Sequence, residues 1–270
     1  MEMDMRGLLP QVEKAVRKAA EFTAVKFTAV EKESVCNIVT SADLAIQQYL
    51  NQALCALVPG SGFFGEEGST GLADAEYLWV VDPIDGTMNF SRGIGEFCIS
   101  VALLRKDEAV LGMVYQPSKD KLFTAVLGGG AQCNGVPIHA SKAAFAEGIF
   151  CTAMSLYRKE FAPQCMAVIA EAYAQCNDVR RFGSCALEIC YLAEGTCDLF
   201  FEFRVFPWDY AGAYLILREA GGHICGAKGE QLRFDKATPI IAANSRENLE
   251  KLLAIVERHI SEFPYQEVFR

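Results

Sequence analysis

Several features that define common classes of protein are absent from this sequence of 270 residues. It has three histidines, and none of its 11 cysteines belongs to a Cys-x-x-Cys pair, which argues against a zinc site. No apolar run approaches the roughly 18 residues of a membrane span, and the N-terminus lacks the apolar core of a signal peptide. Scattered, unpaired cysteines are typical of buried thiols in a reducing compartment. We therefore expect a cytoplasmic protein with no membrane association.

Basic charge is also in short supply. The formal net charge is −9, whereas binding to a nucleic-acid backbone needs a basic face, so the charge disfavours a nucleic-acid partner. The chain has no linker rich in proline, glycine or serine and no repeat of fixed period. Together with 51% hydrophobic and 22% charged residues, this predicts one domain over residues 1–270.

The first half, approximately residues 1–140, predicts two helices and a largely antiparallel sheet. Helical periodicity covers residues 8–30, and a second helix begins with Ser41 as its N-cap and ends before Pro59-Gly60. The stretch YLWVVD has the length of a buried strand. Residues 97–126 contain three apolar runs separated by turn-like residues, which indicates a meander. This half is therefore expected to be of the α+β type.

The second half, approximately residues 141–270, has a different rhythm. The strand-like stretches GIFCTA, CDLFFEF and PIIAAN alternate with helical stretches, and the last helix has Ser245 as its N-cap. Alternation of strands and helices is typical of a layered α/β structure.

Acidic residues follow three apolar elements that are far apart in the sequence. They lie in GEE (65–67), DPID (82–85) and WD (208–209). If the fold brings Glu66, Asp82, Asp85 and Asp209 into one pocket, the four carboxylates repel one another unless cations lie between them. Oxygen ligands without histidine or cysteine favour Mg²⁺, Mn²⁺ or Ca²⁺. Each motif alone is a common turn or cap, but the three together predict a metal site for phosphoryl chemistry.

The residues around Asp85 support this prediction. Pro83 restricts the backbone, so that the carbonyl group of Ile84 can serve as a neutral ligand. Gly86 permits a close approach of the backbone, and the amides of Gly86 and Thr87 can hold a phosphate. The hydroxyl group of Thr87 would then lie beside the metal ions, where it can orient a water molecule.

These segments resemble a known family. GEE, WVVDPIDGTMNF and PWDYAGAYLILREAGG are similar to the signature segments of the inositol monophosphatase family, a group of lithium-sensitive, magnesium-dependent phosphatases. The similarity covers almost the whole chain, including IVTSAD, GGGAQCNG and RRFGSCALEICYLAEG. It implies a layered sandwich of α and β elements, two or three Mg²⁺ ions, a homodimer and hydrolysis of a phosphate monoester by an activated water.

The resemblance also implies roles for individual residues. The first ion would be bound by Glu66, Asp82 and the Ile84 carbonyl, and the second by Asp82, Asp85 and Asp209. Glu66 would also face a third ion through water. Catalysis and phosphate binding fall on Glu66, Gly86 and Thr87, with Glu66 and Thr87 activating the water. The positions where the family contacts substrate hydroxyls are Asp85, Cys185 and Glu202.

One departure from the family concerns the third ion. Lys32 and Asn37 lie where the family has a mobile loop over that ion, and the family often has Asp at the position of Asn37. This difference weakens the expectation of a third ion and of inhibition by lithium.

The identity of the substrate is less defined. Glu202 would accept hydrogen bonds from hydroxyl groups and repel a second phosphate, which favours a polyol monophosphate such as myo-inositol 1-phosphate. Arg180, Arg181 and Arg204 leave open a fructose 1,6-bisphosphatase or an adenosine 3',5'-bisphosphate or NADP phosphatase, unless they pair with acids or form a subunit contact. A regulatory binding protein on the same fold is the non-enzymatic alternative, since some relatives bind nucleic acid or transcription machinery. The complete set of acids with Thr87 favours the enzyme.

Overall fold

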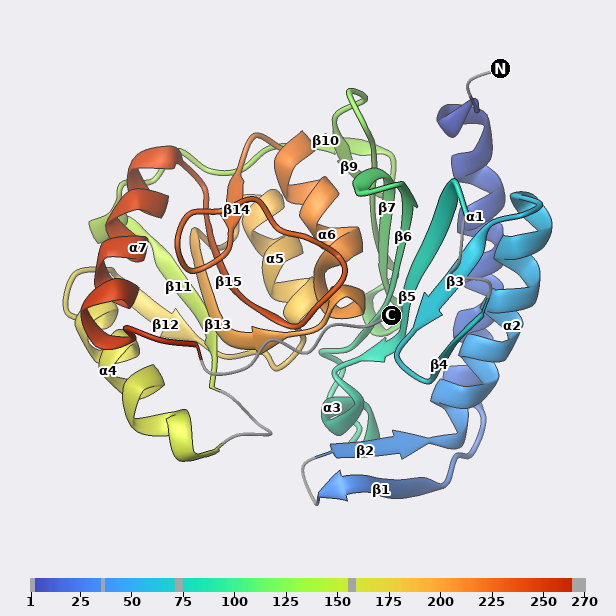
Figure 1. Cartoon of the computed structure of the whole chain (residues 1–270), viewed down its shortest axis with the longest axis horizontal. Coiled ribbons are helices and arrows are strands. Elements are labelled where there is room, and N and C mark those ends of the chain that lie inside the picture. The colour runs from blue at the N-terminus through green and yellow to red at the C-terminus, as the bar shows by residue number, and fades with distance from the viewer. Residues whose placement is uncertain (1–2, 35–36, 71–74, 155–158, 264–270) are drawn as a thin grey trace.

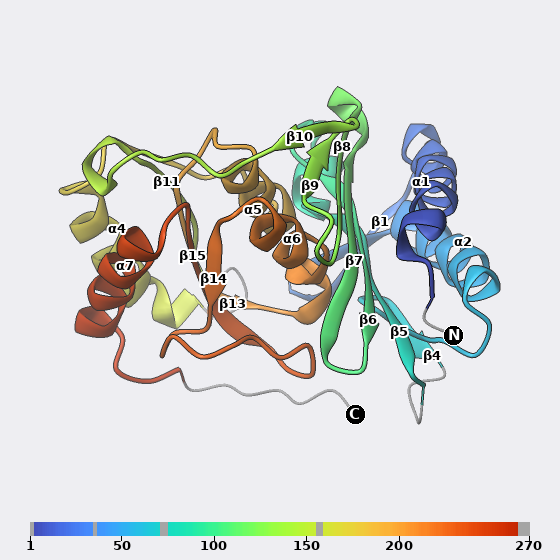
Figure 2. The same ribbon diagram turned by 90° about the horizontal axis from the view of Figure 1, so that it is seen from above.

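The chain folds into alternating layers of helix and sheet (Figure 1). The computed structural model describes residues 3–34, 37–70, 75–154 and 159–263, with the side chains of residues 31–38 outside this description. Two helices cover one sheet, two more lie between this sheet and a second one, and a third pair covers the outer face of the second sheet (Figures 1 and 2). The layered sandwich predicted from the sequence is confirmed.

The larger sheet has eight strands in the order β10-β9-β8-β7-β6-β5-β3-β4. They are β3 (Gly62–Gly65), β4 (Gly68–Thr70), β5 (Tyr77–Asp85), β6 (Cys98–Arg105), β7 (Glu108–Gln116), β8 (Lys121–Val126), β9 (Ala131–Cys133) and β10 (Val136–Ile138). Neighbouring strands are antiparallel except β3 and β5, which are parallel. The predicted meander corresponds to β6, β7 and β8.

The smaller sheet has five strands in the order β12-β11-β13-β15-β14. They are β11 (Ile149–Ala153), β12 (Asp178–Arg180), β13 (Leu199–Val205), β14 (His223–Cys225) and β15 (Thr238–Ala243). Strand β11 is parallel to β12 and β13, whereas β15 is antiparallel to β13 and β14. This mixed sheet and its helices form the layered second half.

The helices occupy three layers. Helices α1 (Met5–Ala20) and α2 (Ser41–Leu57) pack on the outer face of the larger sheet, and α4 (Ala162–Tyr173) and α7 (Arg246–His259) on that of the smaller sheet. Helices α5 (Cys185–Ala193) and α6 (Pro207–Glu219) lie between the sheets (Figure 2). A short helix, α3 (Thr87–Ser91), follows β5, and the hairpin of β1 (Ala29–Ser34) and β2 (Asn37–Thr40) lies beside α3 (Figure 1).

The first predicted helix is shorter than its periodicity suggested. Helix α1 ends at Ala20, a 3-10 turn follows over Glu21–Ala24, and β1 begins at Ala29. The stretch after the turn contains valine, threonine and phenylalanine, which favour strands. The N-cap of α2 is Thr40 rather than Ser41, because the Thr40 hydroxyl accepts hydrogen bonds from the amides of Ala42 and Asp43. In the described part of the chain, no helix combines the length and apolar character needed to cross a bilayer.

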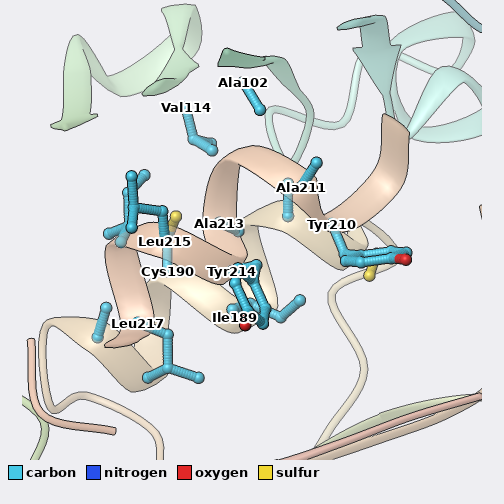
Figure 3. Packing of buried hydrophobic residues seen from close by; sticks show 14 of the residues in the cluster. Ala102, Val114, Ile189, Cys190, Tyr210, Ala211, Ala213, Tyr214, Leu215 and Leu217 are labelled. Carbon is cyan, nitrogen blue, oxygen red and sulfur yellow. The ribbon is translucent and has the colours of Figure 1, made fainter. Parts of the chain in front are cut away.

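The layer between the sheets is closely packed. Figure 3 shows Tyr214 of α6 beside Ile189 of α5, and Leu215 of α6 beside Cys190 of α5 with Val114 of the larger sheet above. Glycine permits this approach, because a Cβ atom on Gly112 of β7 would lie 2.4 Å from the carbonyl oxygen of Gly212 in α6. The close contact with the larger sheet therefore fixes the position of α6 and, with it, that of Asp209 in the first turn of this helix.

Candidate active site

Two adjacent strand ends bring three of the predicted acids together. Strands β3 and β5 are parallel with Gly65 opposite Val81, so Glu66 and Asp82 leave the same edge of the sheet. The register between β5 and β6 shifts between Asp82 and Asp85, where Pro83 interrupts the ladder. A bulge of this kind redirects side chains, and both aspartates line the same pocket.

Asp82 is the most buried of these acids, with 2% of its surface exposed. Its Oδ1 atom accepts a hydrogen bond from the amide of Ile84 at 2.9 Å. Burial raises the pKa of Asp82 well above its ordinary value, and the charges of Glu66, Asp85 and Asp209 raise this pKa further. The direction shows that the negative charge at this position is poorly compensated by the protein alone.

Asp85 lies against the N-terminus of α5. Its Oδ2 atom accepts hydrogen bonds from the Ser184 hydroxyl at 2.6 Å and the Ala186 amide at 2.7 Å, and its Oδ1 atom accepts one from the Cys185 amide at 3.3 Å. Burial raises the pKa of Asp85 to about 6, against the opposing effect of these hydrogen bonds. The helix terminus thus fixes the carboxylate and partly stabilises its charge.

Asp209 enters the pocket from the first turn of α6. Its Oδ2 atom accepts a hydrogen bond from the amide of Phe206 at 2.7 Å, which closes the helix terminus. Burial raises the pKa of Asp209 well above its ordinary value, and the charge of Asp85 adds to this effect. Asp209 lines the same pocket as the strand-end acids, although it lies more than 120 residues after Asp85 in the sequence.

All the acids of the predicted constellation therefore face one pocket. Its lining residues are Glu66, Asp82, Ile84, Asp85, Gly86, Thr87, Met88, Ala153, Arg181, Gly183, Ser184, Cys185, Glu188, Glu202, Arg204 and Asp209. The four predicted carboxylates are hard oxygen donors whose mutual repulsion a divalent cation would relieve, so the donor set fits Mg²⁺. Among the described residues, no three Asp, Glu, His or Cys side chains form a ready-made ion cage, and Mg²⁺ commonly retains several waters as ligands.

The turn after Asp85 contains the close backbone approach that was expected at Gly86. Gly86 has a φ of +93°, and a Cβ atom there would lie 2.9 Å from the carbonyl oxygen of Glu96. The Thr87 hydroxyl, also at the pocket, donates a hydrogen bond to the carbonyl oxygen of Ile84 at 3.0 Å. The predicted phosphate-binding turn and the predicted carbonyl ligand are therefore in direct contact.

The predicted substrate contacts also line this pocket. Cys185 is buried, and Glu202 of β13 is half-buried with a pKa raised well above its ordinary value by burial and then by Glu188. Arg181 and Arg204 line the pocket as well, whereas Arg180 pairs with Asp178.

Glu188 is a pocket residue that the sequence reasoning missed. It lies within α5, is 1% exposed, and has a pKa raised to about 8, chiefly by burial. The available signal was an acid in an otherwise apolar helix, RRFGSCALEICYLAEG. Two other candidates, Lys32 and Asn37, have side chains outside the described residues, so their place relative to the pocket stays a prediction. The described cysteines are free thiols, as predicted.

Comparison with known proteins gives consistent matches. The profile of the inositol monophosphatase family matches residues 5–261. A relative named Nus factor SuhB, from Escherichia coli K12, is 33% identical over 249 residues, which is 90% of this chain and 93% of that protein.

Solved structures agree in fold. The extragenic suppressor protein suhB from Bartonella henselae superposes with a TM-score of 0.86 at 28% identity, over 94% of this chain and 100% of that one. An inositol monophosphatase from Anabaena sp. PCC 7120 superposes with a TM-score of 0.83 at 26% identity, over 96% of this chain and 98% of that one.

Proposed function

Since the chain belongs to the inositol monophosphatase family, we propose that it is a Mg²⁺-dependent phosphatase that hydrolyses polyol monophosphates such as myo-inositol 1-phosphate. One observation carries this proposal: Glu66, Asp82, Asp85 and Asp209, from three separate segments, line one pocket with the Gly86-Thr87 turn. The pKa values of the three aspartates are raised because burial destabilises their charged forms, as does repulsion by neighbouring acids at Asp82 and Asp209, and a bound cation would relieve this repulsion.

The proposed ligands follow from the donors in the pocket. Glu66, Asp82 and the Ile84 carbonyl would hold one ion, and Asp82, Asp85 and Asp209 a second. When bound, Mg²⁺ would neutralise charge on the phosphate and leaving group and lower the pKa of a coordinated water. The number of ions, a third site near Lys32 and Asn37, and inhibition by lithium stay predictions.

The chain's own residues would perform the remaining steps. The amides of Gly86 and Thr87 would hold the phosphate, in a geometry set by the positive φ of Gly86. Glu66 would accept the proton of the attacking water, which the Thr87 hydroxyl would help to orient. Thr87 can do so because its proton is directed to the Ile84 carbonyl at 3.0 Å, which leaves the oxygen lone pairs to accept from water.

The leaving group would lie against Cys185 and Glu202. Two arginine side chains that line the pocket also favour a second candidate class, a phosphatase for substrates that carry two phosphates. Arg181 and Arg204 line the pocket with Glu202, so a second anionic group on the substrate would find partners there. Arg180 already pairs with Asp178 and provides a matched control for its neighbour.

A substrate panel separates these possibilities. Phosphate release is measured with Mg²⁺ and with excess EDTA on inositol 1-phosphate, fructose 1,6-bisphosphate, adenosine 3',5'-bisphosphate and NADP. We expect Mg²⁺-dependent turnover with preference for the monophosphate, and absence of such turnover on every substrate would refute the enzymatic proposal. If a bisphosphate is preferred, Arg181→Ala lowers its turnover selectively and Arg180→Ala does not.

A binding function is the second candidate of a different kind. It is favoured by the name of the 33% identical relatives, Nus factor SuhB. The net charge of −9 still disfavours direct binding to nucleic acid, and this stays a prediction, as do the homodimer and the cytoplasmic location. Retention of a partner by Asp209→Asn, a variant expected to be inactive, would show that binding is independent of catalysis.

A further inference from the structure

A three-residue segment, 182–184, separates the phosphate-binding turn from the helix that holds Asp85. It packs directly on the turn, because a Cβ atom on Gly86 would lie 3.3 Å from the carbonyl oxygen of Gly183. At its other end, the Ser184 hydroxyl donates to Asp85 at 2.6 Å. Any shift of this segment would therefore move a predicted metal ligand and the predicted phosphate cradle together.

Both polar edges of this segment are held by side chains. On one edge, Oε1 of Glu188 accepts hydrogen bonds from the amides of Phe182 at 2.5 Å and Gly183 at 2.9 Å. On the other edge, Nδ2 of Asn89 donates to the carbonyl oxygen of Phe182 at 2.7 Å and approaches that of Gly183 at 3.4 Å. Asn89 lies in α3, directly after the turn, whereas Glu188 lies in α5.

The contact between Gly183 and Asn89 leaves little room for a side chain at position 183. Gly183 has a φ of +83°, and a Cβ atom there would lie 3.1 Å from Nδ2 of Asn89. Asn89 also donates to the carbonyl oxygen of Glu96 at 2.7 Å, which ties the same side chain to the segment before β6. The two side chains thus connect α3, segment 182–184 and α5 across the site.

The choice of an acid at position 188 needs a reason beyond packing. The side chain is 1% exposed, and its Oε2 atom is buried with no hydrogen-bond partner among the described residues. An isolated buried acid costs stability, so a residue that served the core alone would be apolar. The specific role that the structure shows for this acid is to accept hydrogen bonds from two backbone amides, those of Phe182 and Gly183.

We propose that Glu188 and Asn89 act as a pair of positioning residues that clamp segment 182–184 and thereby fix the Asp85 carboxylate relative to the backbone of the Gly86-Thr87 turn. The inference rests on the proposed phosphatase function for its kinetic consequence. Its structural consequence, protection of the Phe182 and Gly183 amides, does not depend on that function.

The decisive variants are Glu188→Leu, which removes the oxygen that accepts from both amides, and Glu188→Gln, which retains one carbonyl oxygen for the two amides. We expect Glu188→Leu to lower kcat by about 10–100-fold and to weaken Mg²⁺ binding, measured by calorimetry, by a similar factor. Glu188→Gln should stay within about threefold of wild type, since an amide oxygen can accept the same bonds. Amide hydrogen exchange at Phe182 and Gly183 should accelerate in Glu188→Leu but not in Glu188→Gln.

Asn89→Ala tests the other half of the clamp and does not require the leucine variant to fold. It should reproduce the loss of Mg²⁺ affinity, and Asn89→Ala combined with Glu188→Leu should lose less than the product of the single effects, because both act on one segment. Asn248→Ala is the matched control: like Asn89→Ala, it removes a side-chain amide that donates to a carbonyl oxygen, here that of Ala143, and also to the Asn244 side chain. That variant should leave Mg²⁺ affinity unchanged.

The outcomes separate the two proposals. A wild-type protein without Mg²⁺-dependent turnover but with protected Phe182 and Gly183 amides and with Mg²⁺ affinity sensitive to position 188 would refute the phosphatase and retain the clamp. Wild-type activity together with a folded Glu188→Leu or Asn89→Ala that keeps kcat, Mg²⁺ affinity and amide protection within about threefold would overturn the clamp. Strictly multiplicative effects in the double variant would also overturn it.

Discussion

The buried acid at position 188 predicts a specific dependence of stability on pH. The pKa of Glu188 is raised from an ordinary 4.5 to about 8, chiefly by burial. A raised pKa means that the folded chain keeps this proton while the unfolded chain loses it. The contribution of Glu188 to stability is therefore complete below pH 4.5 and is lost progressively as the pH rises toward 8.

The magnitude follows from the size of the shift. Each pH unit in this window lowers the free energy of unfolding by about 1.4 kcal/mol through this one group, which gives roughly 3 kcal/mol between pH 4.5 and pH 7. The perturbation is Glu188→Gln, which cannot titrate but has the same shape. The stability of this variant relative to wild type should therefore increase by roughly 3 kcal/mol over the same range.

The assay is reversible unfolding in urea, with EDTA present so that cations do not contribute, followed by the fluorescence of Trp79 and Trp208. The quantity of interest is the difference in free energy of unfolding between variant and wild type at pH 5, 6 and 7, because titrating groups that do not interact with Glu188 cancel in this difference. A difference that is constant within about 0.5 kcal/mol over this range would refute the reasoning, since an ionised Glu188 predicts no slope.

Three further outcomes are expected. Asp209→Asn should lower phosphatase kcat/KM by about 100-fold or more. It should not lower the melting temperature of the metal-free protein, since it removes a repelled charge. An equal loss of kcat/KM in the surface control Asp178→Asn would contradict a specific role for Asp209. Mg²⁺ should raise the melting temperature more at pH 8 than at pH 5, because Asp85, with a pKa of about 6, must lose its proton to bind the ion. An increase in melting temperature that does not depend on pH would argue against carboxylate ligands. Gly112→Ala should destabilise the fold by about 1–3 kcal/mol in urea unfolding, because its Cβ would lie 2.4 Å from the carbonyl oxygen of Gly212; wild-type stability would show that α6 can move.

Local patterns were enough to predict most elements of the fold. Alternating apolar runs and turn residues predicted the meander, and Ser245 was correctly identified as the N-cap of α7. The end of α1 was predicted poorly, because helical periodicity continued into residues that pair as β1. Such a boundary depends on whether a partner strand is available, and β2 supplies it through the pairs Ala29–Thr40 and Val30–Val39.

The site was predicted in its acids but not in its supporting groups. Acids at strand ends carry a local signal, and the family resemblance added Cys185 and Glu202. For Glu188 the sequence offered only an acid within an apolar helix, which does not reveal its role, because its partners are backbone amides of a loop and its burial comes from packing between the sheets. The two neighbouring arginines show the same limit: Arg180 pairs with Asp178 while Arg181 lines the pocket, a choice that depends on strand orientation.

The arrangement of α5 and α6 explains how so many acids coexist in a folded chain. Each helix directs its N-terminus at one carboxylate: the amides of Cys185 and Ala186 donate to Asp85, and the Phe206 amide donates to Asp209. Such donors stabilise negative charge, yet the pKa of both aspartates remains raised, so their stabilisation is smaller than the cost of burial and repulsion. The difference is the free energy that a bound cation would recover, so the buried layer that makes the fold rigid would also give the pocket its proposed affinity for a metal ion.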